Sequence, residues 1–200
     1  MNRRVMVLHA CVVSAALVVV VPGAQAGDCP PDVDVCVRVE PPDLVVDINS
    51  TSTFTLDLVA DINTPVVGWG LDLNIETPGV VSVTGTPDIP FPPWIDVFAP
   101  DGDGLAAVAD PFPPTNGSVS GLNILLATLT FSVDRLGETD LVPSVTEGDL
   151  TEGFPLDPMG FGTVTFQNGH VMVIPEPTTA ILLALAFAVA KPRRRSHRRR

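Results

Sequence analysis

The body of this 200-residue chain has almost no positive charge and no tyrosine. Nine of the eleven Lys and Arg residues lie in the first four positions or the last ten, so the span from Gly27 to Ile174 keeps only Arg38 and Arg135. Two basic against 22 acidic residues give that span a formal charge of −20. Nucleic acids bind through Lys and Arg contacts to phosphate, so this composition argues against a nucleic-acid partner.

Catalytic patterns are also lacking. His170 is the only histidine of the body, and no Ser-His-Asp or Cys-His arrangement accompanies it. A lone histidine in a predicted strand is more often structural than catalytic. We therefore expect no enzyme and no required cofactor. A secreted hydrolase is the weaker alternative, because two of the many acids could form a carboxylate pair, although nothing singles out which two.

The first 26 residues have the three parts of a signal peptide. Arg3 and Arg4 supply a positive start, an apolar stretch runs from Val5 to Val21, and Pro22 ends it. The small residues Ala24 and Ala26 then predict cleavage before Gly27 by signal peptidase. The alternatives are an uncleaved N-terminal anchor and, less favoured, a lipoprotein attached at Cys29.

The last 26 residues, 175–200, combine a short motif, an apolar segment and a basic end. Pro175-Glu176-Pro177 precedes the 13 residues from Thr178 to Ala190, and a Lys- and Arg-rich terminus follows. At ~1.5 Å per residue a helix of that length spans roughly 20 Å, less than the ~30 Å of a bilayer core. The segment is therefore marginal as a permanent anchor. We expect it to contact the membrane at least transiently, with the basic end held on the cytoplasmic side.

This arrangement resembles the sorting tails of bacterial PEP-CTERM proteins, which are substrates of exosortase-type sorting enzymes. The resemblance covers about Val173 to Arg200. It implies recognition at Pro175, Glu176 and Pro177, removal of the tail, and delivery to the outer envelope, cell surface or extracellular matrix of a bacterium. The alternative is a plain tail anchor that carries Pro-Glu-Pro by chance.

Alternation of apolar and polar residues predicts strands through most of residues 43–174. The clearest are Thr53–Ala60, Val67–Ile75 and Ile124–Val133, and the shorter candidates are Leu44–Ile48, Val80–Thr84, Leu105–Ala109, Phe161–Phe166 and His170–Ile174. We expect an all-β, jelly-roll-like antiparallel β-sandwich of about eight or nine strands. A signal helix and a short hydrophobic C-terminal helix flank it.

Several phrases in these strands resemble the superfamily of cohesins and carbohydrate-binding modules. They are Phe54–Val59, Val67–Leu73, Leu126–Phe131 and the closing Asn168–Val171. The resemblance spans roughly Val37 to Ile174 and implies a sandwich that binds proteins or polysaccharides.

Two cysteines remain once Cys11 leaves with the signal peptide. An even count in an oxidising compartment predicts a disulfide between Cys29 and Cys36. It would staple residues 27–42, which are expected to form a Pro-rich leader without a core of its own.

A cluster of aspartates offers the one candidate for a metal. Asp96, Asp101, Asp103 and Asp110 fall around Asp101-Gly102-Asp103-Gly104, and alternating Asp and Gly can present several hard oxygens to calcium. The twelfth position counted from Asp101 is Phe112, so an EF-hand is excluded. A solvated turn is the favoured interpretation, and a looser calcium site the alternative.

The two tryptophans receive different predictions. Trp69 alternates in phase with Leu71 and Leu73 and is expected in the core. Trp94 follows Phe91-Pro92-Pro93 in a predicted loop, where an exposed ring could stack on a sugar.

Export signals without a catalytic set favour a non-enzymatic structural or adhesive component of the envelope or extracellular matrix. A carbohydrate- or protein-binding module is the first alternative.

Overall fold

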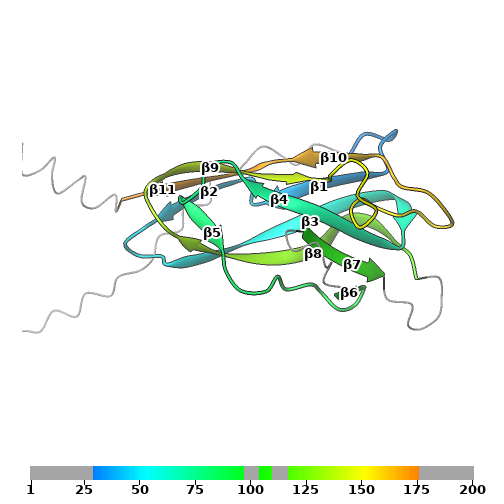
Figure 1. The fold of residues 1–200 in the computed structure, drawn as a ribbon, viewed down its shortest axis with the longest axis horizontal. Helices are drawn as coiled ribbons and strands as arrows, with labels where there is room; N and C mark the ends of the chain where they lie inside the picture. Colours follow the sequence, from blue (N-terminus) through cyan, green and yellow to red (C-terminus); the bar gives the residue numbers. More distant parts are fainter. Residues whose placement is uncertain (1–28, 97–103, 110–116, 176–200) are drawn as a thin grey trace, which may run out of the picture.

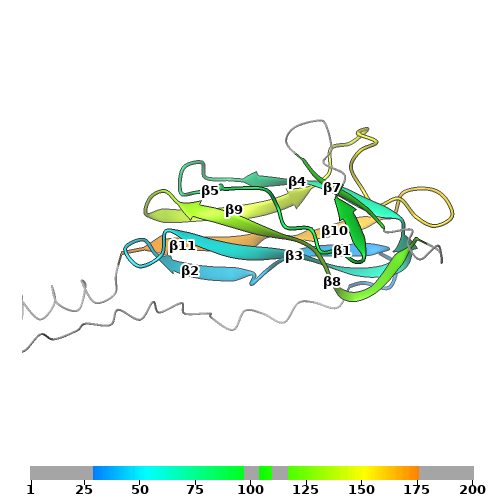
Figure 2. The same ribbon diagram turned by 90° about the horizontal axis from the view of Figure 1, so that it is seen from below.

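The computed structural model describes residues 29–96, 104–109 and 117–175, and the regular structure in these ranges is entirely β. Two layers of strands pack face to face along the long axis of the molecule (Figures 1 and 2). Eleven strands lie in the described ranges: β1 (Val35–Glu40), β2 (Asp43–Asp47), β3 (Thr53–Val66), β4 (Gly68–Ile75), β5 (Val81–Val83), β6 (Trp94–Asp96), β7 (Gly104–Ala109), β8 (Val119–Val133), β9 (Gly137–Ser144), β10 (Val164–Gln167) and β11 (Gly169–Ile174).

The strands form one five-stranded and one six-stranded sheet. The first has the order β10-β1-β3-β8-β5 and the second the order β2-β11-β9-β4-β7-β6. The predicted all-β sandwich is therefore confirmed. The expectation of a purely antiparallel sandwich is wrong, because β1 pairs with β10, and β2 with β11, in parallel.

The parallel pairs arise because two strands change sheets without reversing direction. Only Pro41 and Pro42 separate β1 from β2, and only Asn168 separates β10 from β11. Each pair of consecutive strands thus begins in the five-stranded sheet and ends in the six-stranded one. The described chain starts at one end of the sandwich and leaves at the opposite end, after Ile174 (Figure 1).

The core lies between the sheets and uses the faces that alternation predicts. Leu56 and Leu58 of β3 are 3% and 0% exposed, and Leu71 of β4 is 0% exposed. Trp69 is also buried, as predicted, and its ring meets that of Trp94 edge to face at 6.2 Å. Such aromatic contacts add to the stabilisation that burial itself provides.

The boundary predicted between leader and sandwich is wrong. Residues 27–42 contain β1, which lies between β10 and β3 in the five-stranded sheet. Val35, Val37 and Val39 are at most 2% exposed, so this strand contributes a full row to the core. Prolines flank this strand on both sides and argue against a strand, although its residues alternate at period two. The sandwich therefore begins at Val35 instead of residue 43.

Two further strands were not predicted. β9 reads as polar, since its inward positions are Thr139, Leu141 and Pro143 and its outward ones carry acids. β6 has only three residues and follows a proline pair. Both are strands because neighbouring strands pair with them, which local sequence does not reveal.

The predicted signal helix and C-terminal hydrophobic helix lie outside the described residues. Within residues 29–96, 104–109 and 117–175 no helix is long and apolar enough to cross a bilayer.

Candidate functional site

The outer face of the six-stranded sheet carries a row of acids around His170. His170 of β11 lies opposite Asp43 of β2 on one side and Asp140 of β9 on the other. Glu76 continues the row, because its N–H donates to the carbonyl of Asp140 at 3.0 Å. The neighbours in sequence, such as Leu44, Leu141 and Val171, point into the core, so the polar side chains point outward. We call this row, together with Glu138, the acidic face.

A shallow pocket of about 180 Å³ lies in the acidic face. Its lining residues are Glu76, Thr77, Glu138, Thr139, Asp140 and His170. His170 Nδ1 lies 2.6 Å from Asp140 Oδ1, and both side chains are more than a third exposed. The buried Thr139 hydroxyl accepts the Thr77 N–H at 2.9 Å. Three carboxylates at the rim make this pocket suited to a cationic group, such as a basic side chain of a partner.

A segment between β9 and β10 lies against the first half of β4, next to the acidic face. We call residues 145–156 the strap. Gly153 of the strap and Gly70 of β4 exchange two backbone hydrogen bonds of 2.9 and 2.7 Å, and Leu156 bridges to Val66. A Cβ on Gly70 would lie 2.1 Å from the carbonyl oxygen of Thr151. Only glycine therefore permits the strap to lie this close to β4.

Two carboxyl groups meet beneath the strap. Glu152 is 7% exposed and accepts the N–H of Thr146. Asp72 of β4 accepts the Thr146 hydroxyl on Oδ2 at 3.1 Å, whereas its buried Oδ1 has no hydrogen-bond partner among the described residues. Burial raises the pKa of Glu152, the Thr146 N–H opposes that rise, and the charges of Asp72 and Asp149 add to it.

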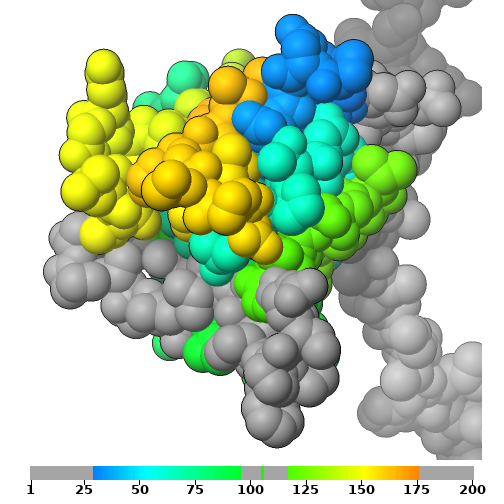
Figure 3. All heavy atoms as spheres, turned by 90° about the vertical axis from the view of Figure 1, so that its right-hand side faces the viewer, coloured from blue at the N-terminus to red at the C-terminus, as the bar shows by residue number. Residues whose placement is uncertain are grey.

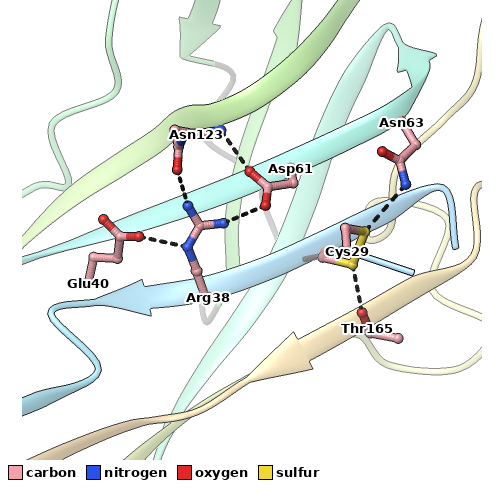
Figure 4. Close-up of polar contacts among 8 residues, drawn as sticks. Cys29, Arg38, Glu40, Asp61, Asn63, Asn123 and Thr165 are labelled. Atoms are coloured by element: carbon pink, nitrogen blue, oxygen red, sulfur yellow. Dashed lines mark hydrogen bonds and ion pairs between the residues drawn. A yellow bond between two sulfur atoms is a disulfide. The ribbon is translucent and has the colours of Figure 1, made fainter. Parts of the chain in front are cut away.

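A second buried polar cluster lies on the outer side of the five-stranded sheet (Figure 4). Arg38 of β1 donates Nε to Glu40 at 2.6 Å, pairs with Asp61 of β3 at 3.1 Å, and donates Nη2 to Asn123 of β8. Its side chain is 6% exposed. Burial disfavours the charge of Arg38, yet hydrogen bonds to Glu40 and Asp61 outweigh it and raise its pKa.

The start of the described chain is tied to β3 and β10. Cys29 and Cys36 form a disulfide, and Asn63 donates its amide to the carbonyl of Val33 at 2.8 Å. Asp34 accepts the hydroxyl of Thr64 and both the N–H and the hydroxyl of Thr163. These bonds lower the pKa of Asp34, with Thr64 the largest cause. Figure 3 shows this end of the molecule, where the first described residues (blue) lie beside the segment that precedes β10 (orange).

The structure corrects the prediction for Trp94. Its side chain is 0% exposed, and Nε1 donates to the carbonyl of Leu125 at 2.9 Å. Trp94 therefore belongs to the core and is not available to stack on a sugar. The proline pair before it leads into β6, so the ring points inward instead of into solvent.

The remaining predicted site residues fall largely outside the described ranges. Asp96 ends β6, while Asp101, Asp103 and Asp110 are not described. The described residues contain no group of three or more His, Cys, Asp or Glu arranged to hold a metal ion. Ala24, Ala26 and Gly27 of the signal site, and Glu176 and Pro177 of the sorting motif, also lie outside; Pro175 is exposed at the end of β11.

Sequence reasoning missed both buried clusters. Arg38 carried a usable signal, since an arginine inside an alternating strand of a body with only two basic residues needs acidic partners. Glu152 carried none, because it is one of many acids and only the folded strap buries it.

The fold defines the class of this protein as a two-layer β-sandwich, and solved structures narrow that class. The third ScaB cohesin of R. flavefaciens, in complex with a group 1 dockerin, matches with a TM-score of 0.52 at 12% identity, over 72% of this chain and 97% of that one. A type III cohesin module from the cell-surface anchoring scaffoldin ScaE of Ruminococcus flavefaciens matches with a TM-score of 0.51 at 10% identity, over 75% and 94%. No protein-family model and no curated protein matches the sequence. The body thus has a cohesin-like β-sandwich fold, which confirms the cohesin resemblance at the level of fold.

Proposed function

We propose that this protein is an exported, non-enzymatic binding module whose cohesin-like sandwich holds another protein at the cell surface. The observation that carries the proposal is the extent of the fold match, which includes 97% and 94% of two cohesin modules. One of these modules was solved with a dockerin bound, and the other comes from a cell-surface anchoring scaffoldin. The bound dockerin favours a protein ligand, and the cell-surface scaffoldin favours an extracellular location.

The acidic face is the surface we assign to the partner. Glu76, Glu138 and Asp140 surround a pocket there, and the body as a whole is strongly acidic. A partner with basic side chains would therefore be steered towards this face, and its binding would weaken with salt.

The test compares charge reversals on the two sheets. The test variant is full-length protein with Glu138→Lys and Asp140→Lys. The control carries Asp88→Lys and Asp134→Lys, because Asp88 and Asp134 are exposed and lie by the five-stranded sheet. Secreted proteins of the native host captured by the unaltered protein are purified and titrated against all three. Saturable one-to-one binding lost only in the first variant supports the proposal. Binding that is absent, or equal in all three, contradicts it.

The two ends support delivery to the surface. The signal peptide would be removed by signal peptidase, and Pro175-Glu176-Pro177 would be recognised by an exosortase-type enzyme. Intact mass and fractionation from the host, with and without that enzyme, test this. A chain that starts near Gly27 and ends near Pro175 supports sorting, whereas an intact C-terminus in the membrane regardless of the enzyme makes the tail a plain anchor.

A structural or adhesive role in the extracellular matrix is the second candidate, and the sorting tail favours it. Matrix that loses cohesion when the gene is deleted, with no saturable protein partner found, would favour it over the binding module. Retention on a host polysaccharide would instead favour the carbohydrate-binding alternative, with a surface other than Trp94. Calcium binding around Asp96, Asp101, Asp103 and Asp110 stays the alternative to a solvated turn, and calcium titration of the purified protein tests it.

A further inference from the structure

The strap is anchored through its second half and buries little apolar surface in its first half. Gly70 and Gly153 exchange two backbone hydrogen bonds, Val67 donates its N–H to the carbonyl of Pro155 at 2.9 Å, and Leu156 bridges to Val66 of β3. Phe154 is fully buried, whereas Val145 and Leu150 are exposed, at 38% and 82%. The first half of the strap is therefore a candidate for local opening at a free energy well below that of global unfolding.

The charged groups at the strap are all acidic. Glu152 faces Asp72 from β4 and Asp149 from the strap itself, and Glu147 is exposed on the same segment. β9 offers Ser144 opposite Asp72, and β7 offers Gly104. Neither basic residue of the described body neutralises these carboxylates. Arg38 lies in the cluster of the five-stranded sheet, and Arg135 donates to the carbonyl of Pro78.

Glu152 and the buried Asp72 Oδ1 lack one hydrogen-bond donor between them. The Thr146 N–H and hydroxyl already serve Glu152 Oε2 and Asp72 Oδ2. Asp72 Oδ1 is buried with no partner among the described residues, and the side chains of Asp72 and Glu152 lie within hydrogen-bonding reach of each other. A proton on Glu152 would supply the missing donor and remove one of two like charges.

We propose that the strap is a proton-dependent clasp, closed on β4 when Glu152 is protonated and donates to Asp72, and loosened when Glu152 is ionised. The clasp lies beside the acidic face, since both use the outer side of β4 and β9. Acidification would therefore order the chain at one border of that face, and a rise in pH would free it. The inference does not depend on what the acidic face binds.

The direction of the pH dependence follows from the pKa of Glu152. Burial raises that pKa above its ordinary value of 4.5. A carboxyl group whose folded pKa is raised stabilises the closed state fully below the unfolded value, and that contribution is lost as the pH rises through the folded pKa. The closed strap is thus the acid form. This is opposite to an ordinary salt-bridged acid.

Hydrogen exchange of the purified protein tests the clasp directly. Protection of strap amides is measured at about pH 4, below the ordinary carboxyl value, and at about pH 8, well above it, after correction for the intrinsic rate. The amides of β3 serve as internal reference. Glu152→Gln keeps an acceptor for Thr146 and places a permanent donor near Asp72, and Glu147→Gln is the matched control on the same segment.

The proposal predicts that strap amides lose several-fold protection at the higher pH in the unaltered protein and in Glu147→Gln. Protection of the β3 amides should stay unchanged. Glu152→Gln must stay protected at both pH values. Should Glu152→Gln fail to fold, Asp72→Asn, which also removes one of the two charges, must flatten the same dependence. Protection that is equal at both pH values in the unaltered protein, or a neutral variant that loses protection as the unaltered protein does, overturns the proposal.

Discussion

Arg38 shows how a single residue joins three strands. It is one of two basic residues in the body, and it bonds to Glu40 of β1, Asp61 of β3 and Asn123 of β8. The backbone N–H of Asn123 also donates to Asp61 at 2.7 Å. Register shifts between β3 and β8 fall at Leu58/Val59 and Ala60/Ile62. The cluster therefore holds the two strands together where their backbone pairing is irregular.

Replacing Arg38 with Met should lower the free energy of unfolding by about 3–5 kcal/mol, because it leaves Asp61 buried without its counter-charge. Urea denaturation measures the loss. Arg135→Met is the control, since the exposed Arg135 side chain makes one hydrogen bond, to the carbonyl of Pro78. This variant should cost less than about 1 kcal/mol. Equal losses in the two variants would show that the buried cluster has no special role.

Trp94 makes a second prediction at the residue scale. Trp94→Ala removes a fully buried ring together with its bond to Leu125, and should cost about 3–5 kcal/mol. Phe91→Ala, at a 71% exposed position in the preceding loop, should change stability by less than about 0.5 kcal/mol. Thermal unfolding of both variants checks this. A Trp94→Ala protein as stable as Phe91→Ala would mean that the ring is not part of the core.

The strap gives the clearest prediction at the scale of an element. Gly70→Ala places a Cβ 2.1 Å from a backbone oxygen that cannot rotate away, so the strap must move. Overpacking of this kind costs about 1–3 kcal/mol. Limited proteolysis should then cut within residues 145–156 faster than in the unaltered protein. Asn74→Ala, at an exposed position on the same side of β4, is the control, and equal cleavage in both would contradict the close approach.

The hydrogen bonds that Asp34, just before β1, accepts from Thr64 and Thr163 should weaken in acid. The folded pKa of Asp34 lies below its ordinary value of 3.8, so its stabilising contribution is complete above that value and is lost as the pH falls through the folded pKa. Thermal midpoints measured down to about pH 2.5 should fall less in Asp34→Asn than in the unaltered protein. Asp32→Asn, an exposed neighbour, should follow the unaltered protein. Parallel curves for all three would remove Asp34 as a cause.

At the scale of the whole molecule, the disulfide lies far from the point where the chain leaves the last strand. Cys29 and Cys36 close a short loop, with a separation of 7 residues, at one end, while the chain leaves β11 at the other (Figure 1). Tension applied through the C-terminal end would thus reach β11 and β2 before it reaches β1, because β11 pairs directly with β2 and β9.

Removing both cysteines should weaken the whole sandwich modestly. For so short a loop the entropy model predicts a loss of roughly 2–3 kcal/mol. Cys29→Ser with Cys36→Ser, compared with the unaltered protein under oxidising conditions, tests this by urea denaturation. The two proteins should become equally stable once the unaltered one is reduced. A difference that persists after reduction would assign the effect to the buried position of Cys36, which is 5% exposed.

Local sequence determined the class of fold and most of its strands. Period-two alternation places apolar residues on one side of a strand wherever one side is buried, so β3, β4 and most of β8 could be predicted with their inward faces. The predicted export signals come from short motifs, and the scarcity of basic residues in the sandwich comes from composition. Neither needs tertiary structure to be stated.

Tertiary structure alone decided which strands pair and which polar residues are buried. β9 and β6 are too polar or too short to be strands by themselves, and neighbouring strands supply the hydrogen bonds that hold them. Trp94 and Asp72 lie far in sequence from the groups that contact them, and Glu152 is buried only because the strap lies against β4. The burial of these three side chains is a sum over neighbours that the fold brings together, and the local pattern around them does not encode it.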